Sequence, residues 1–188
     1  NFAGLNINSQ LADISWGNLS PQLAKAGIPI IKDINETTAS ISIEYEISAQ
    51  NENGTTEYYL VTDFYRMRYD ESRIRLLDFE RSASEIFDPS LGVISDSGLL
   101  LGVRNKNVDY LTNEEGTVTA FTQNGDLWTY APDTGKFVEV FTFRKNDNGD
   151  FRDARVEHGI KLLSVDNNGD VDFMVYGYMN RGAHEGYS

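Results

Sequence analysis

The sequence predicts an all-β, mostly antiparallel protein with one short helix near its N-terminus. Three observations lead to this fold class. Apolar and polar residues alternate strictly over a long stretch, short apolar runs are separated by turn residues, and no run after residue 30 has the periodicity of a long helix. We expect the strands to form propeller-like blades or a β-sandwich.

The helix is predicted within residues 1–38, a segment that we expect to be distinct from a β-rich domain over residues 39–188. In "NLSPQLAKAGIP", Ser20 suits an N-cap, Pro21 suits the first helical position and Gly27 suits the stop. The run "QLAKA" between these residues is typical of a short helix.

The clearest strand signal is "ASISIEYEISA" at residues 39–49. Its alternation gives the strand one apolar face and one face of serines and glutamates. The apolar residues are Ala39, Ile41, Ile43, Tyr45 and Ile47. The turns "QNENG" and "DES" lead into two further strand-like stretches, so residues 39–81 are predicted to form a three-stranded meander.

Residues 93–188 contain pairs of short apolar runs that are typical of hairpins. "QNGDLWTY" and "NNGDVDFMVY" both place Asn-Gly-Asp before an apolar strand that ends in tyrosine. Their glycines, Gly125 and Gly169, are 44 positions apart, which is close to the length of one propeller blade.

This half of the chain resembles blades of TolB-like or peptidase-associated β-propellers. The resemblance implies one four-stranded blade over residues 93–143 and the start of the next over residues 160–188. It also implies that the chain is a fragment of a larger propeller.

The charge and composition argue against several classes of function. The net charge is −13, from 29 acidic and 16 basic residues, so binding to nucleic acid is not expected. The absence of cysteine excludes disulfides, thiol catalysis and cysteinyl metal sites. No apolar run reaches the roughly 18 residues of a transmembrane helix. These features and the start at Asn1 favour an extracytoplasmic piece of a larger bacterial protein, secreted or membrane-anchored through other sequence.

The tripeptide Asn-Gly-Asp occurs at 124–126, 148–150 and 168–170. Asn-Gly between strands favours a type I′ turn, because both residues tolerate the positive φ that this turn requires. On this interpretation the three loops need no ligand.

A second interpretation applies to "VDNNGDVDF" (165–173), where oxygen-bearing side chains alternate as hard cations require. The loop resembles the calcium loops of FG-GAP or VCBS repeats, although Val171 replaces the second glycine of that pattern. The resemblance implies a structural calcium ion bound by Asp166, Asn168, Asp170 and Asp172. No other cofactor is expected.

Two further groups of residues are candidate ligand-binding sites. "YRMRYDESRIR" contains Arg66, Arg68, Arg73 and Arg75 around one predicted hairpin. They either bind an anionic partner or a sugar acid, or pair across strands with Glu44, Glu46 or Glu57. The loop "MNRGAHEG" gathers Arg181, His184 and Glu185, and is either a binding or acid/base site or a solvated connection.

Motifs for catalysis are not found. The sequence has no paired-histidine zinc motif, no Gly-x-Ser-x-Gly elbow and no nucleotide-binding glycine motif, so no catalytic residue is assigned. We therefore expect a non-catalytic extracytoplasmic binding or scaffolding module of a surface or secreted protein, with a protein or glycan at the cell surface as partner. The alternative is a carbohydrate- or peptide-active hydrolase domain, or its accessory domain.

Overall fold

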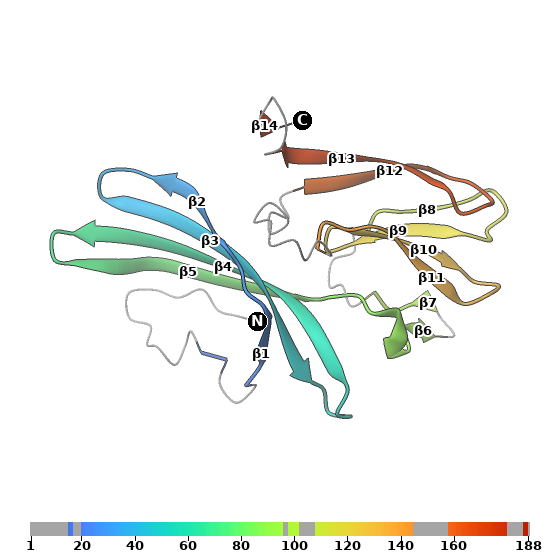
Figure 1. Cartoon of the computed structure of the whole chain (residues 1–188), viewed down its shortest axis with the longest axis horizontal. Helices are drawn as coiled ribbons and strands as arrows, with labels where there is room; N and C mark the ends of the chain where they lie inside the picture. Colours follow the sequence, from blue (N-terminus) through green and yellow to red (C-terminus); the bar gives the residue numbers. More distant parts are fainter. Residues whose placement is uncertain are drawn as a thin grey trace. The chain divides into compact units, whose positions relative to one another are not determined.

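The computed structural model describes residues 15–16, 20–95, 98–101, 108–144, 158–179 and 186–187. The chain divides into two compact units, Asn1–Ile86 and Phe87–Ser188, and both are built from antiparallel strands (Figure 1). The predicted all-β, antiparallel fold class is therefore confirmed. No helix within the described ranges is long and apolar enough to cross a membrane.

The N-terminal unit is a five-stranded antiparallel sheet. β3 (Thr38–Gln50), β4 (Thr56–Asp70) and β5 (Arg73–Glu85) follow one another along the chain and pair as neighbours. β1 (Gln22–Lys25) and β2 (Pro29–Ile34) both pair with β3 on its other side. The alternating stretch of the sequence is the body of β3.

The predicted N-terminal helix is wrong, because Gln22–Lys25 form β1, which pairs with the end of β3. Ser20 has a φ of 39°, outside the extended conformation of an N-cap residue. Gly27 is not a helix stop. A Cβ atom at this position would lie 1.9 Å from the carbonyl oxygen of Glu44, so glycine allows the chain to approach β3. Pairing with a long strand thus outweighs the helical propensity of four residues.

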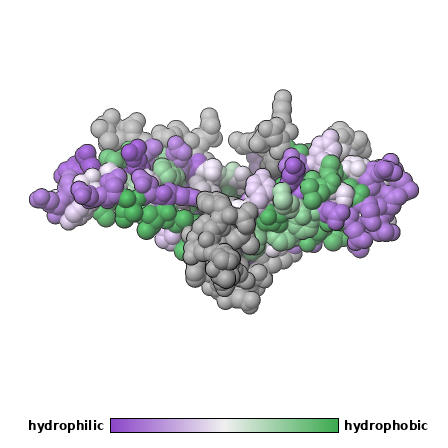
Figure 2. All heavy atoms as spheres, turned by 90° about the horizontal axis from the view of Figure 1, so that it is seen from above, coloured by the Kyte–Doolittle hydropathy of each residue, from purple (hydrophilic) through white to green (hydrophobic). Residues whose placement is uncertain are grey.

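The two faces of this sheet differ in polarity. On the first face Val61 and Phe79 are buried, with 0% and 3% exposure, around the carboxylate of Asp63. Towards the start of β5 the same face is exposed, and Ile34 and Ile74 are both 68% accessible. The second face carries mainly serine, threonine and charged side chains, together with Tyr58, Leu60 and Phe64 of β4. Figure 2 shows hydrophobic residues gathered on one side of this sheet and hydrophilic residues on the other.

The centre of the C-terminal unit is a four-stranded antiparallel meander. Its strands are β8 (Tyr110–Thr112), β9 (Thr119–Gln123), β10 (Asp126–Ala131) and β11 (Lys136–Phe141). It is preceded by the 3-10 helix η2 (Pro89–Leu91) and the hairpin of β6 (Ile94–Ser95) and β7 (Gly98–Leu99). It is followed by the hairpin of β12 (His158–Val165) and β13 (Val171–Met179), and β14 (Gly186–Tyr187) pairs with the end of β13.

Both faces of this meander are covered. On one face Phe121 packs against Phe87 and Val93, from the segment that contains β6 and β7. On the other face Leu127 packs against Ile160 of β12. The meander is thus the middle layer between two smaller hairpins, and its two cores together form the interior of the unit.

The two described Asn-Gly-Asp turns differ. Asn124 and Gly125, between β9 and β10, have φ values of 49° and 81°, as a two-residue type I′ turn requires. Between β12 and β13 only Gly169 has positive φ, at 88°. The type I′ prediction is therefore wrong at Asn168, where a longer loop joins the strands. The copy at 148–150 lies outside the described residues.

Candidate functional site

The arginines that the sequence singled out share one face of the N-terminal sheet. Arg66 and Arg68 are two positions apart on β4, and Arg73 and Arg75 are two positions apart on β5. The strand register brings Arg68 directly opposite Arg75. All four are exposed. We call this surface, formed by Arg66, Arg68, Arg73 and Arg75, the arginine face.

The arginine face is only partly neutralised. Arg75 forms a salt bridge with Asp70, and both side chains are well exposed. Among the residues that the structure describes, no carboxylate forms an ion pair with Arg66, Arg68 or Arg73. Three guanidinium groups therefore remain available to an anion from outside the described chain.

The carboxylates expected to pair with these arginines have other positions. Glu57 lies on the opposite face of the sheet and accepts hydrogen bonds from Asn51 and Tyr59. Glu44 is on the same face as the arginines, but it is opposite Thr62, four residues along β4 from Arg66. On the arginine face the cross-strand ion pair is formed instead between Arg75 and Asp70, the aspartate that precedes the β4–β5 turn.

Strand β3 adds hydroxyl groups next to the arginine face. Thr38 lies opposite Arg68, and Ser40 lies opposite Arg66. One step further along, Ser42 lies opposite Phe64. Guanidinium groups bind carboxylates and sulfates through paired hydrogen bonds, and hydroxyl groups bond to alcohols. The surface thus combines groups that suit a ligand with both acidic and hydroxyl functions.

A buried ion pair on the other face of the same strands fixes their register. The Nε and Nη2 atoms of Arg81 donate to the two carboxylate oxygens of Asp63, both at 2.6 Å. The hydroxyls of Tyr45 and Tyr65 each donate to Oδ2 at 3.1 Å. The ring of Trp16 lies 4.6 Å from the guanidinium carbon of Arg81. Sequence reasoning missed this cluster, although charged residues at apolar positions of β4 and β5 were a signal for it.

The pKa values of Tyr45, Tyr65 and Arg81 are raised in this cluster. Burial, and then the charge of Asp63, raise the pKa of Tyr45 to about 12. Burial also raises the pKa of Tyr65. The hydrogen bond to Asp63 raises the pKa of Arg81. Both tyrosines therefore stay protonated and keep donating to the carboxylate, which satisfies the buried charge.

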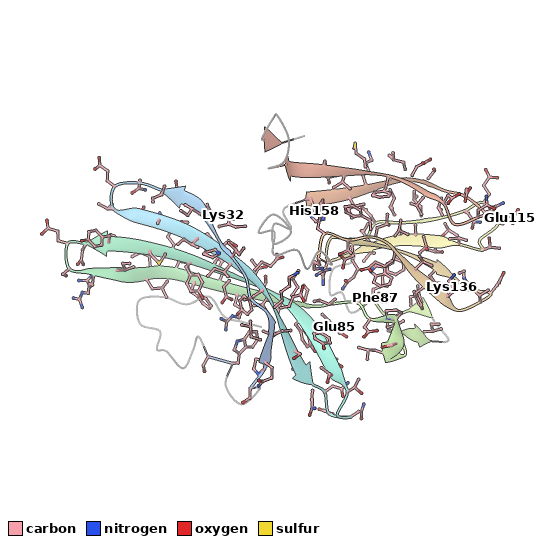
Figure 3. The ribbon with its side chains drawn as sticks, in the orientation of Figure 1. Lys32, Glu85, Phe87, Glu115, Lys136 and His158 are labelled. Atoms are coloured by element: carbon pink, nitrogen blue, oxygen red, sulfur yellow. The ribbon has the colours of Figure 1, made fainter. Side chains whose placement is uncertain are left out.

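Glu57 and Glu85 form a second titratable group on the same face. A hydrogen bond from Tyr59 at 2.6 Å, followed by one from Asn51 at 2.7 Å, lowers the pKa of Glu57. Burial, followed by the charge of Glu57, raises the pKa of Glu85, which ends β5 (Figure 3). Their environments therefore push the pKa values of the two carboxyl groups in opposite directions.

The side chains of the predicted calcium loop take part in its turn. Oδ1 of Asp166 accepts hydrogen bonds from the backbone N–H groups of Asn168, at 2.8 Å, and Asp170, at 2.9 Å. Oδ2 accepts one from the side-chain amide of Asn168 at 3.2 Å. Asp172 instead accepts a hydrogen bond from Ser164 of β12 at 2.8 Å.

The β3–β4 turn has the same backbone hydrogen bonds, but their acceptor is an asparagine instead of an aspartate. Oδ1 of Asn51 accepts from the backbone N–H groups of Asn53 and Thr55, both at 3.0 Å. Gly54, like Gly169, has positive φ. A neutral amide therefore accepts the same backbone hydrogen bonds here as the carboxylate of Asp166 does in its loop. Among the described residues no group of three or more His, Asp or Glu side chains is placed to hold a metal ion.

In the C-terminal unit, His158 anchors the type I′ turn. Its Nε2 atom lies 3.1 Å from the carbonyl oxygen of Gly125, and its ring packs 4.3 Å from that of Phe143 (Figure 3). Arg144 bonds to the carboxylate of Asp126 and, at 3.0 Å, to the carbonyl oxygen of Asn124. Because these contacts are buried and serve the turn, we assign this cluster a structural role.

Arg181, His184 and Glu185 lie outside the described residues, so their predicted site stays a prediction. Comparison with known proteins gave no match, since no family model, curated protein or solved structure is significantly similar to the chain. The arginine face is therefore the best-supported candidate site on geometry alone.

Proposed function

We propose that the chain is a non-catalytic, extracytoplasmic binding module that holds an anionic glycan on its arginine face. One observation carries this proposal. Exposed arginines converge on one face of two paired strands, and Arg68 lies directly opposite Arg75 although their charges repel. A carboxylate or sulfate bound between the two guanidinium groups turns this repulsion into attraction.

The hydroxyl groups of β3 favour a glycan over a simple anion. Thr38 and Ser40 lie next to the arginines and provide donors and acceptors for sugar hydroxyls. A sheet of this kind suits an extended polymer, because the arginines of each strand are spaced about 7 Å apart along it. The arginine face is therefore suited to repeated acidic groups along one chain.

We also propose that the C-terminal unit is a pair of propeller-like blades. The four-stranded meander of β8–β11 has the strand order of a blade, and the β12–β13 hairpin packs on one of its faces as a following blade does. On this proposal the unit is part of a larger surface or secreted protein.

Screening immobilised glycans tests the binding proposal. The wild-type chain should bind glycans rich in carboxylate or sulfate groups and should not bind neutral glycans of the same backbone. The double variant Arg66→Gln/Arg68→Gln should lose this binding. Lys136→Gln/Lys161→Gln is the matched control, because it removes the same charge from exposed residues of the other unit. Equal loss in both double variants would show a general charge effect and contradict the proposal.

A hydrolase is the second candidate, and the two glutamates favour it. Catalytic carboxyl pairs have pKa values that their surroundings push apart, as those of Glu57 and Glu85 are. A hydrolase would release reducing ends from a glycan bound on the face of Glu57 and Glu85, which is opposite the arginine face, and Glu85→Gln would abolish that release. Binding without hydrolysis over prolonged incubation supports the module instead.

A further inference from the structure

The outer edge of β5 is the longest edge of the N-terminal sheet. β5 has 13 residues and is the last strand in the sheet order. Among the described strands only β4 pairs with it. Such an edge presents a row of backbone N–H and C=O groups that can pair with another strand. The kind of strand that can pair with β5 depends on the order of the side chains along β5.

The sequence of β5 is complementary to itself. The midpoint of "RIRLLDFE" (73–80) lies between Leu76 and Leu77. At equal distances on the two sides of this midpoint, Arg75 corresponds to Asp78, Ile74 to Phe79 and Arg73 to Glu80. Each cation is matched with an anion and each apolar residue with an apolar residue. We propose that β5 pairs antiparallel with β5 of a second copy of this chain, around a two-fold axis between Leu76 and Leu77.

The irregularity in β5 makes this register possible. Two paired residues must point to the same face of a continuous sheet. In a regular strand Arg75 and Asp78 point to opposite faces, because side chains alternate. The register of β5 against β4 shifts between Leu76 and Asp78, so that Arg75 lies opposite Arg68 and Asp78 lies opposite Arg66. Both residues therefore project on the arginine face.

The same shift places the apolar residues together. Ile74 lies opposite Tyr69, and Phe79 lies opposite Tyr65, which are both on the first face of the sheet. Ile74 is 68% exposed in the single chain. Pairing would cover it with the partner's β5, and would give two Arg73–Glu80 and two Arg75–Asp78 pairs across the axis. Charges and bulges on an edge usually prevent pairing, but here they match in one register.

Charge reversal at the two ends of the pair tests this proposal. Arg73→Glu puts a carboxylate opposite Glu80 in both outer pairs, and Glu80→Arg puts a guanidinium opposite Arg73 in both. Each variant alone should weaken the dimer at least about tenfold, since each converts two attractive cross-strand pairs into repulsive ones. An equimolar mixture of the two variants should dimerise again, because both new pairs are then complementary.

Sedimentation equilibrium over a concentration series measures this directly. The wild-type mass should rise from 21.1 kDa towards twice that value, and the mixture of variants should do the same. Glu52→Arg, in the exposed β3–β4 turn, is the control and should leave the dimer unchanged. Thermal melts of dilute samples check that each variant folds. A wild-type chain that stays monomeric, or a mixture that does not associate, would overturn the proposal.

Discussion

Arg68 of β4 and Arg75 of β5 lie directly opposite each other on an exposed sheet surface. Like charges in this position destabilise a sheet, whereas opposite charges contribute roughly 0.2–1 kcal/mol per pair. Arg75 is partly neutralised by Asp70. The remaining repulsion is a local loss of stability that an anionic ligand would reverse, and this links stability to binding at the arginine face.

Arg68→Glu should therefore stabilise the N-terminal sheet and abolish anion binding. The substitution creates an opposite-charge pair with Arg75, so the free energy of unfolding should rise by about 0.2–1 kcal/mol in urea denaturation. Arg66→Glu is the matched control, because Arg66 lies opposite Asp78 and the same change there should lower stability. If both substitutions changed the free energy of unfolding in the same direction, the local pairing of charges would not explain the change.

Removing one partner of the buried ion pair should be strongly destabilising. The side chains of Asp63 and Arg81 are only 3% and 7% exposed. Asp63→Ala leaves the guanidinium of Arg81 without its carboxylate, and loss of a buried partner costs about 3–5 kcal/mol. Urea denaturation measures this loss.

A double-mutant cycle provides the control for the buried pair. Asp63→Leu/Arg81→Met replaces both charges with apolar side chains, so its destabilisation should be smaller than that of Asp63→Ala. Additive losses in the cycle would show that the two groups do not interact.

Alkaline pH should unfold the N-terminal sheet. The pKa of Tyr45 is raised to about 12 in the folded chain, whereas an unfolded tyrosine ionises near 10. The folded state therefore binds this proton more tightly, and its contribution is complete below pH 10 and is lost between about pH 10 and 12.

Tyr45→Phe should remove this part of the alkaline transition. The transition is monitored by the ultraviolet absorbance of the phenolate. Tyr69→Phe is the control, because Tyr69 is exposed at 57%. A transition unchanged by Tyr45→Phe would contradict the assignment.

The stability contributed by the loop of Asp166 should not depend on the metal concentration. Asp166→Asn should keep most of the stability, because Asn51 makes the same backbone hydrogen bonds in the β3–β4 turn. Asp166→Ala should lower the stability more than Asp166→Asn does, since it leaves these N–H groups without their acceptor. Thermal melts in EDTA, calcium and magnesium check both variants.

A calcium-specific rise of the wild-type midpoint, lost in Asp166→Asn, would identify a metal loop instead. Acid provides an independent test. The backbone hydrogen bond from Asp170 is the largest of the causes that lower the pKa of Asp166. The contribution of this carboxylate to stability is therefore present above the unfolded pKa and is lost as pH falls through the folded pKa. The Asp166→Asn variant should lack this dependence.

Local patterns predicted the meander of β3, β4 and β5, but not the pairing of β1 and β2 with β3. The alternation in β3 predicted its two faces, and Asn124-Gly125 predicted a type I′ turn. The helix predicted between Pro21 and Gly27 does not form, because pairing of Gln22–Lys25 with β3 outweighs the helical propensity of so short a run. At Asn168 the turn type depends on loop length, which Asp166 sets through its hydrogen bonds.

The same limit applies to the candidate site. Alternation showed that Arg66 and Arg68 share a face, and that Arg73 and Arg75 do. That both pairs lie on one face, with Arg68 opposite Arg75, depends on the β4–β5 register. The ion pair of Asp63 and Arg81 depends on that register as well, because the two residues are 18 positions apart in the sequence.

The central claim is that guanidinium groups on the arginine face bind an acidic glycan. The most direct measurement is calorimetric titration of polygalacturonate into the wild-type chain, Arg68→Lys and Arg68→Gln, with neutral galactan as the ligand control. We expect measurable binding that weakens with added salt, a partial loss in Arg68→Lys and a nearly complete loss in Arg68→Gln, with none to galactan. Equal affinity of the wild-type chain and Arg68→Gln for the acidic glycan would contradict this claim.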